Sequence, residues 1–383
     1  MRHPLFAACV AVVTLLSSAA FAATEDARQP TPAVAEQHEP KIQVAVLLDT
    51  SSSMDGLINQ TREQLWKIVN TFATAKRDGK RPRLELALYD YGNDTNPVAN
   101  DYVRRIVPLT GDLDKVSEAL FALKTNGGSE YCGAVIAHAT KELEWSKDSR
   151  DLKLIYIAGN EPFSQGSVRF QDSVKAAIEQ GIVVNTIHAG TEAEGVSGQW
   201  LAAAKMADGN YLFIDQNRAV ARVAAPQDAE LVKLSAQLNK TYVAYGTAGR
   251  TAAARQEAQD KNASGLSVGT GAARAASKAS AGYKNSEWDL VDAKKDGKGV
   301  GSVASEDLPA EMQAMKPAER EQFVEQKSKE RAQLQAQIAK ISGERDQFVQ
   351  AELKKQANAG PKTMDEALLE SAKVQAKKKD FAF

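Results

Sequence analysis

Hydrophobic and polar positions alternate along the chain in a way that predicts strands and helices in turn. Residues 42–48 are almost continuously apolar, which is typical of a strand buried on both faces of a parallel sheet. A stripe of apolar residues then recurs at helical spacing: Leu57, Ile58, Leu65, Ile68, Val69 and Phe72. A buried strand followed by an amphipathic helix is the unit from which α/β domains are built.

The same alternation continues to about residue 243. Further strands are predicted at 84–91, 102–109, 152–158, 182–188 and 211–214, and further helices at 112–123, 133–145, 170–180, 198–207 and 228–239. Strands separated by helices of this length are joined by right-handed crossovers. The pattern therefore predicts an α/β fold with a doubly wound, mostly parallel sheet over residues 41–243.

The pattern changes after residue 243. Residues 244–305 are rich in Ala, Gly and Ser, and 246–282 contain no aromatic side chain. So few large apolar groups predict a linker or a loosely ordered helix.

Residues 306–383 are strongly charged and predicted to be helical. Leu334, Ile338, Ile341 and Phe348 form a partial coiled-coil seam, which Arg345 interrupts. The seam is either a pairing surface for a homo-oligomer or one side of a solvated helix that packs on its own domain. The imperfect heptads favour the second alternative.

The N-terminus has the pattern of a signal peptide. Arg2 and His3 precede the apolar run 5–16, and small residues around Phe21 provide a cleavage site within residues 1–23. The alternative is an uncleaved anchor, because residues 5–23 are nearly long enough to span a bilayer. Residues 24–40 are predicted to be a flexible lead-in. No later segment is apolar enough to cross a membrane, so we expect a periplasmic or secreted protein without a transmembrane segment after signal removal.

Composition and the absence of certain motifs exclude several classes of function. The chain has 383 residues and a net charge of −1, with 48 basic and 49 acidic residues, so no net field favours nucleic acid. After signal removal Cys132 is the only cysteine, which excludes an internal disulfide and a cysteine-based zinc site. Phosphate-binding P-loop and His-Glu-x-x-His zinc motifs are absent from the sequence.

A polar loop follows the first predicted strand and contains the best candidate ligands. Asp49 provides a carboxylate, and Ser51 and Ser53 provide hydroxyls. The carboxyl edge of a doubly wound sheet is where ligands bind, and Mg²⁺ and Mn²⁺ prefer oxygen ligands. The alternative is helix capping, for which Asp and Ser are also favoured. A cap needs one such residue and here five stand in a row at 49–53, so a divalent-cation site is the preferred interpretation.

Residues 47–54 resemble the metal-ion-dependent adhesion site of von Willebrand factor A domains, and the likeness covers roughly residues 41–243. The resemblance implies a mostly parallel sheet between helices and a cation that accepts an acidic group from a protein partner. The family has Gly-Gly-Thr in its second loop. Gly127 and Gly128 precede Ser129 here, so Ser129 is the implied hydroxyl ligand and Thr125 the fallback.

The third loop of this chain departs from the family pattern. Where the family has Thr-Asp-Gly, Gly159 stands in place of the aspartate. Asn160 or Glu161 could reach the site directly or through water, and Glu130 follows Ser129 on the same predicted face. Loss of one charge is expected to weaken cation binding or to alter which metal is chosen.

These observations favour a binding protein that is not an enzyme. One alternative is an envelope assembly or scaffold protein that acts through its helical C-terminus, with a weak or vestigial metal site. Another is an enzyme with Cys132 as nucleophile and His188 as base. The sequence suggests no third residue to orient that pair, so Cys132 is better interpreted as a small packed hydrophobe.

Overall fold

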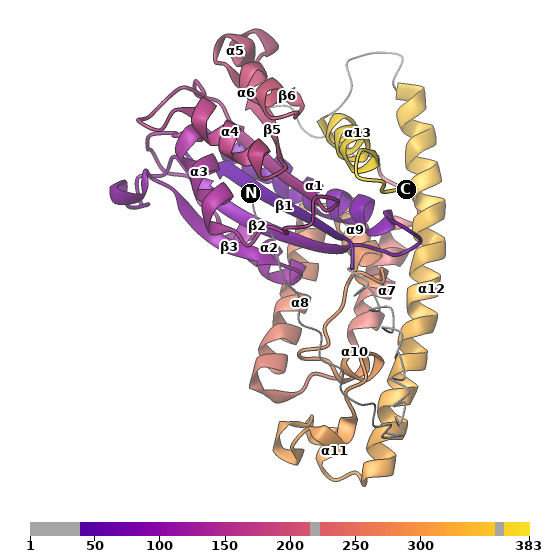
Figure 1. The fold of residues 1–383 in the computed structure, drawn as a ribbon. Helices are drawn as coiled ribbons and strands as arrows, with labels where there is room; N and C mark the ends of the chain where they lie inside the picture. Colours follow the sequence, from indigo (N-terminus) through magenta and orange to yellow (C-terminus); the bar gives the residue numbers. More distant parts are fainter. Residues whose placement is uncertain (1–38, 215–222, 357–363) are drawn as a thin grey trace, which may run out of the picture. The chain divides into compact units, whose positions relative to one another are not determined.

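The computed structural model describes residues 39–214, 223–356 and 364–383. A six-stranded sheet of order β3-β2-β1-β4-β5-β6 lies at the centre of the α/β region (Figure 1). Its strands are β1 (Lys41–Asp49), β2 (Arg83–Tyr91), β3 (Arg104–Thr110), β4 (Leu152–Gly159), β5 (Ile182–Ala189) and β6 (Tyr211–Ile214). β3 pairs antiparallel and the other pairings are parallel. The predicted fold class is confirmed.

Helices cover both faces of the sheet because β1 and β4 are apolar on both sides. Val44 and Leu48 of β1 pack in the core beneath α1 (Asp55–Thr74) and α2 (Leu113–Ala122). The opposite core lies under α3 (Cys132–Glu142), α4 (Phe170–Glu179) and α6 (Trp200–Met206), and α5 (Glu192–Ser197) follows β5. This layering is the physical basis of the continuous apolar run at 42–48.

A helical region follows the sheet. It contains α7 (Asp228–Asn239), α8 (Gly246–Leu266), α9 (Val268–Ala279), α10 (Leu290–Lys295), α11 (Ala310–Gln313) and α12 (Pro317–Gln356), and the 3₁₀ turns are η1 (Val98–Asn100), η2 (Val300–Ser302) and η3 (Ser305–Asp307). Residues 246–282, for which the sequence predicts a linker or a loosely ordered helix, form the two helices α8 and α9. A Cβ on Gly271 would lie 2.6 Å from Ser264 Oγ and 3.0 Å from Val232 Cγ2, so the small residues allow α7, α8 and α9 to approach closely.

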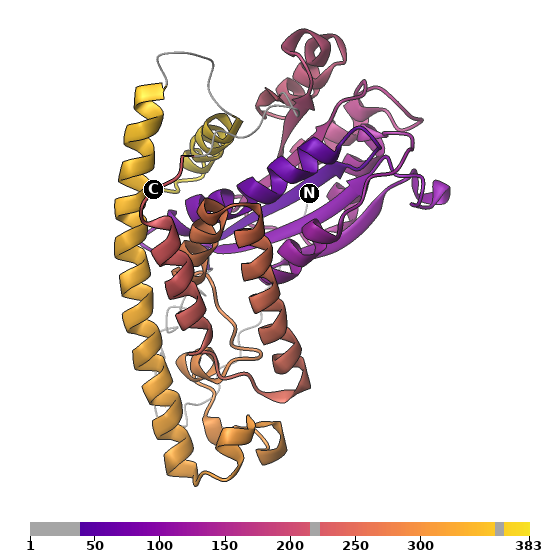
Figure 2. The same cartoon turned by 180° about the vertical axis from the view of Figure 1, so that it is seen from behind.

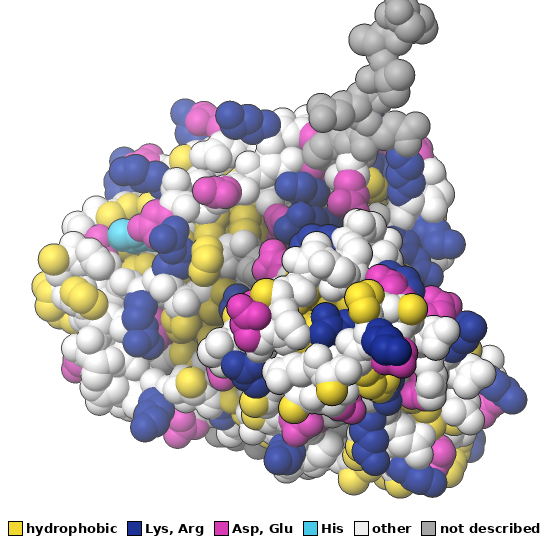
Figure 3. All heavy atoms as spheres, turned by 90° about the horizontal axis from the view of Figure 1, so that it is seen from below, with side chains coloured by type: hydrophobic (Ala, Val, Ile, Leu, Met, Phe, Trp, Pro, Cys, Tyr) yellow, Lys and Arg dark blue, Asp and Glu magenta, His cyan; other side chains and the backbone are white. Residues whose placement is uncertain are grey.

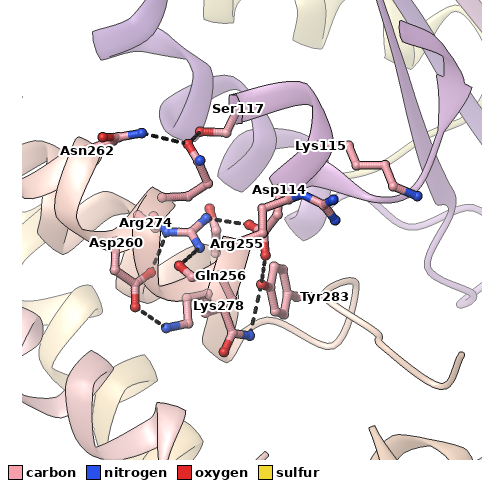
Figure 4. A network of polar contacts seen from close by, with 12 residues as sticks. Asp114, Lys115, Ser117, Arg255, Gln256, Asp260, Asn262, Arg274, Lys278 and Tyr283 are labelled. Atoms are coloured by element: carbon pink, nitrogen blue, oxygen red, sulfur yellow. Dashed lines mark hydrogen bonds and ion pairs between the residues drawn. The ribbon is translucent and has the colours of Figure 1, made fainter. Parts of the chain in front are cut away.

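Buried charges connect this helical region to the sheet's helices (Figure 4). Arg274 of α9 donates to Asp114 of α2 at 2.8 Å and to Asp260 of α8 at 2.5 Å. Lys278 Nζ lies 2.6 Å from Asp260, and the Tyr283 hydroxyl donates to Asp114 at 2.5 Å. Each carboxylate in this cluster therefore has a cationic partner, as buried charges require.

The long helix α12 runs alongside the helical region, as Figures 1 and 2 show. Ile338 is fully buried against α7 and α9, and Leu334 and Ile341 pack on the same cluster. Arg345, which interrupts the predicted seam, donates to Asp228 of α7 at 2.5 Å. Three of the four apolar positions of the seam therefore pack against other helices of the same chain, in agreement with the alternative of a solvated helix that packs on its own domain.

The last helix, α13 (Met364–Lys377), returns to the sheet. Gln375 donates to Asn185 of β5 at 2.7 Å. Phe381 is buried in the core under α1, with the Arg77 guanidinium 4.9 Å from its ring centre. The end of the chain thus contributes to the α/β core, although the sequence assigns residues 306–383 to a separate helical region.

The predicted signal peptide at 1–23 and nearly all of the lead-in at 24–40 lie outside the described residues. Of the helices within 39–214, 223–356 and 364–383, none combines the length and hydrophobicity that crossing a bilayer requires. Basic and acidic side chains are interspersed on the face drawn in Figure 3, in keeping with the near-neutral sequence.

Candidate metal centre

The candidate site lies at the topological switch point of the sheet, between β1 and β4. β1 pairs with β2 on one side and with β4 on the other, and the chain leaves β1 and β4 toward opposite faces, into α1 and α4. The loops after β1 and β4 therefore diverge and leave a crevice at their carboxyl ends. Asp49 is the last residue of β1, so the sequence-predicted ligand stands at this point.

Asp49 is fully buried and incompletely paired. Its Oδ1 accepts a hydrogen bond of 2.8 Å from the Ser51 backbone N–H, whereas its Oδ2 has no hydrogen-bond partner among the described residues. Burial raises the pKa of Asp49 to about 7, against the lowering effect of Ser51 and of the Asn160 backbone amide. A buried carboxylate with a free oxygen is costly, and a bound cation would remove that cost.

Hydroxyl and amide groups from two loops meet beside this carboxylate. The hydroxyl oxygens of Ser51 and Ser53 lie 3.4 Å apart. Asn160, directly after β4, donates from its side chain to Ser53 Oγ at 3.2 Å, and its own Oδ1 is buried without a partner in the described residues. The structure thus brings together Asp49, Ser51, Ser53 and Asn160.

The second loop lies against the same site, with its two predicted hydroxyls placed differently. A Cβ on Gly128 would lie 2.5 Å from the backbone oxygen of Gly92, so the loop between α2 and α3 approaches the end of β2 closely. Ser129 follows, half-buried, and its hydroxyl forms no hydrogen bond to another described residue. Thr125 instead donates to Asp55 of α1 at 2.8 Å, so its hydroxyl is engaged at the start of that helix.

The third loop leaves no room for the missing carboxylate. A Cβ on Gly159 would lie 3.0 Å from Asp49 Oδ2 and only 2.5 Å from the Tyr91 hydroxyl oxygen. Tyr91 is the last residue of β2, lies opposite Asp49 in the sheet, and donates to the Ala158 backbone oxygen at 3.1 Å. The sequence gives no sign of this arrangement, because a tyrosine at the end of a strand is equally typical of an ordinary core residue.

Glu130, Glu161 and Asp94 act on one another electrostatically beside the site. Burial raises the pKa of Glu130, and Glu161 and Asp94 raise it further, whereas a hydrogen bond with the Ser51 hydroxyl lowers it. Glu161 accepts a hydrogen bond of 3.1 Å from Gln165, which turns one of its oxygens toward its own loop. Glu130 and Glu161 thus both lie near the cluster.

The donor set fits a hard divalent cation. In the part of the chain that the structure describes, no group of three or more His, Cys, Asp or Glu side chains is arranged to hold a metal ion. A cation here would be held by oxygens of mixed type: the carboxylate of Asp49 and the hydroxyls of Ser51 and Ser53. Such a set suits Mg²⁺ or Mn²⁺ better than a soft metal.

The alternative nucleophile has the properties of a packed residue. Cys132 is buried, and burial raises the pKa of its thiol well above the ordinary value, so the thiol stays protonated at neutral pH. His188 is also buried, burial lowers its pKa, and it packs against Trp200. The sulfur of Cys132 lies 3.7 Å from the Tyr91 hydroxyl rather than next to a base.

Comparison with known families gives the class of the sheet region. Residues 43–222 match the model of the von Willebrand factor type A domain. This segment of the chain is therefore a von Willebrand factor type A (VWA) domain.

Several solved structures are similar to the chain at low identity. The VWA domain of SpRpn10 is 15% identical, with 45% of this chain and 88% of that chain covered and a TM-score of 0.35. Proximal thread matrix protein 1 from the mussel byssus, with a zinc-occupied MIDAS motif, is 14% identical over 47% of this chain, with a TM-score of 0.34. This chain spans 43% of the length of that protein.

A bacterial structure, an aerotolerance-related membrane protein from Bacteroides fragilis, is 16% identical over 45% of this chain and 92% of that chain, with a TM-score of 0.32. No curated protein sequence matches the chain.

Proposed function

We propose that this protein binds a protein partner through a divalent cation held at the carboxyl edge of its VWA domain. The observation that carries the proposal is the buried Asp49 carboxylate with its unpaired Oδ2. VWA domains are generally interaction modules rather than enzymes, which agrees with this role. Asp49, Ser51 and Ser53 would hold the cation, and Ser129 would add a hydroxyl from the second loop.

Helix capping does not account for the polar loop. The residue that precedes α1 is Met54, and no side chain caps that end of the helix. The carboxylate of Asp49 bonds within its own loop, and the hydroxyls of Ser51 and Ser53 lie next to each other. This leaves cation binding as the better reason for the run of Asp and Ser residues.

The cation we propose is Mg²⁺ or Mn²⁺. Each donor is an oxygen, and no thiolate or imidazole belongs to the set, which favours hard cations. The motif of the mussel protein holds zinc in its solved structure, so the class of ion is best decided by direct titration of this chain.

The partner we propose is a protein that offers an acidic side chain in the periplasm or outside the cell. A carboxylate oxygen would complete the coordination of the cation, as the resemblance to the adhesion site implies. The scaffold alternative has less support, since Leu334, Ile338 and Ile341 already pack within the chain.

Calorimetric titration of the full chain with Mg²⁺ and with Mn²⁺ tests the cation. We expect saturable binding by the wild type and none by Asp49→Ala. Asp172→Ala, which removes an exposed carboxylate from α4, serves as the matched control and should bind as the wild type does. Equal titrations of wild type and Asp49→Ala would remove the basis of the proposal.

Recovery of partners from the native envelope, with and without a chelator, tests the second half of the proposal. A partner that binds through the cation should be lost both with the chelator and with Asp49→Ala. A protein retained under both conditions binds elsewhere on the chain.

A further inference from the structure

The predicted ligands supply only one negative charge to a divalent cation. Asp49 is a carboxylate, whereas Ser51 and Ser53 are neutral hydroxyls. A side chain at Gly159 would collide with the Tyr91 hydroxyl, which lies 2.5 Å from the position its Cβ would take. A second carboxylate for the cation therefore cannot come from position 159, where the family has its aspartate.

Glu130 is placed to provide that carboxylate. A Cβ built on Gly92 would lie 2.8 Å from Glu130 Cγ and 3.0 Å from Asp49 Oδ1, so both side chains border the same small space. The Ser51 hydroxyl lowers the pKa of both Asp49 and Glu130. The side chains of Asp49, at the end of β1, and of Glu130, in the loop before α3, therefore lie close together across Gly92.

Gly92 maintains this contact. Its φ is +72°, a left-handed conformation that disfavours any other residue, and a side chain there would collide with Glu130. The loop after β2 thus leaves open the space that Asp49 and Glu130 share.

The electrostatic surroundings of Glu130 support the same conclusion. Its side chain is half-buried, Glu161 and Asp94 raise its pKa, and its own charge raises the pKa of Asp49. The groups that act most strongly on Glu130 and on Asp49 include no cationic side chain of the chain itself. A bound cation would relieve this repulsion, and Asp49 Oδ2 remains buried and without a partner in the described residues.

We propose that Glu130 is a ligand of the cation and supplies the second carboxylate of the site, from the second loop instead of the third. This inference rests on the proposed cation and adds a residue of this chain to its coordination. It makes the Asp49–Glu130 pair, with the hydroxyls of Ser51 and Ser53, the charge-balanced core of the centre.

Calorimetric titration with Mn²⁺ at pH 7.5 tests the role of Glu130. The full chain is compared with Glu130→Gln, which keeps the shape of the side chain and removes its charge. Asp94→Asn is the matched control, because it removes a neighbouring charge that also acts on Glu130. We expect Glu130→Gln to raise the Kd about 10- to 100-fold, the usual range when a residue that supports a metal is lost, and Asp94→Asn to raise it much less.

A second measurement separates loss of binding from loss of folding. Thermal unfolding in a chelator should give Glu130→Gln a melting temperature equal to or above that of the wild type, because a repelled charge is gone. Added Mn²⁺ should then raise the melting temperature of the wild type and of Asp94→Asn, but hardly that of Glu130→Gln.

The outcomes distinguish this inference from the proposed function. If the wild type binds Mn²⁺ and Glu130→Gln binds it equally well, Glu130 is no ligand and the cation site stands without it. Equal weakening by Glu130→Gln and Asp94→Asn would indicate a general effect of charge and would also overturn the ligand role. Absence of cation binding by the wild type would overturn the proposed function itself.

Discussion

Two buried clusters of charge in this protein are organised in opposite ways. Where α2, α8 and α9 meet, Asp114 and Asp260 are paired with Arg274 and Lys278 (Figure 4). At the carboxyl edge of the sheet, Asp49 is fully buried but has an unpaired oxygen. The first cluster carries its own counter-charges and is complete as a structural junction, whereas the second lacks them and is suited to an external cation.

The pKa values of the carboxylates differ between the two clusters in the same way. Burial would raise the pKa of Asp260, but Lys278 and Arg274 outweigh burial and hold it below its ordinary value. Burial raises the pKa of Asp49 to about 7, and its neighbours do not restore it. The difference shows that burial alone does not identify a functional carboxylate, because the absence of a cationic partner is the informative part.

The largest effect is expected from breaking the complete cluster. Arg274→Ala leaves Asp114 and Asp260 buried without their shared partner, which should lower the free energy of unfolding by about 3–5 kcal/mol. Urea unfolding followed by circular dichroism measures this. Arg169→Ala, at an exposed ion pair on the surface, should change little, and a similar loss in both variants would contradict the comparison.

In the absence of cation, substitution of Asp49 is expected to increase the free energy of unfolding, whereas Arg274→Ala lowers it. The folded state binds the Asp49 proton more tightly than the unfolded state, whose pKa is near 3.8, so folding stability should fall as the pH rises from about 4 to about 7. Asp49→Asn removes this dependence and should be more stable at pH 7.5 by a few kcal/mol, on the order set by the shift.

Unfolding in a chelator at pH 5 and pH 7.5 measures the effect at Asp49. Added Mg²⁺ should stabilise the wild type and leave Asp49→Asn unchanged. If the stability difference between the wild type and Asp49→Asn were the same at both pH values, the pKa of Asp49 would be less perturbed than its burial implies.

An intermediate effect is expected when the family's aspartate is restored. Gly159→Asp forces a side chain against the Tyr91 hydroxyl and should destabilise the protein by about 1–3 kcal/mol. Combining it with Tyr91→Phe removes the hydroxyl and should recover part of the loss, so the two changes should not be additive. Additive losses in thermal unfolding would show that Tyr91 is not what excludes a side chain at this position.

The smallest effect on folding is expected at Ser53. Its side chain is exposed, so Ser53→Ala should change the stability by no more than about 0.5 kcal/mol while weakening Mn²⁺ binding in calorimetry. Unchanged Mn²⁺ affinity would remove Ser53 from the ligand set and leave Asp49 and Ser51.

Local patterns were sufficient to predict the sheet and the first loop of the site. The strand at 42–48 is apolar on both faces, and Asp49 follows it directly, so both features depend on residues close together in sequence. The Tyr91 hydroxyl occupies the space that a side chain at Gly159 would need. This contact joins distant segments of the chain, so no local pattern reveals it. The second loop was placed by resemblance, and the structure leaves the Ser129 hydroxyl without a described partner.

The helical region could not be predicted for a related reason. Residues 246–282 lack the large side chains from which a core is usually inferred, and they fold because small residues let helices approach and because Arg274 reaches Asp114. The pairing of Arg274 with Asp114 cannot be predicted from local sequence, because the two residues lie far apart along the chain. The return of α13 to the sheet likewise depends on contacts such as Gln375 with Asn185, which lie far apart in sequence.

The burial of Phe381 in the core beneath α1 has a consequence for the order of folding during synthesis. Strand β6 ends at Ile214, yet the face that α13 covers stays open until α13 emerges. At ordinary translation rates this interval is on the order of ten seconds. During it the domain is incomplete, and a fragment cut at residue 222 would present an uncovered apolar face.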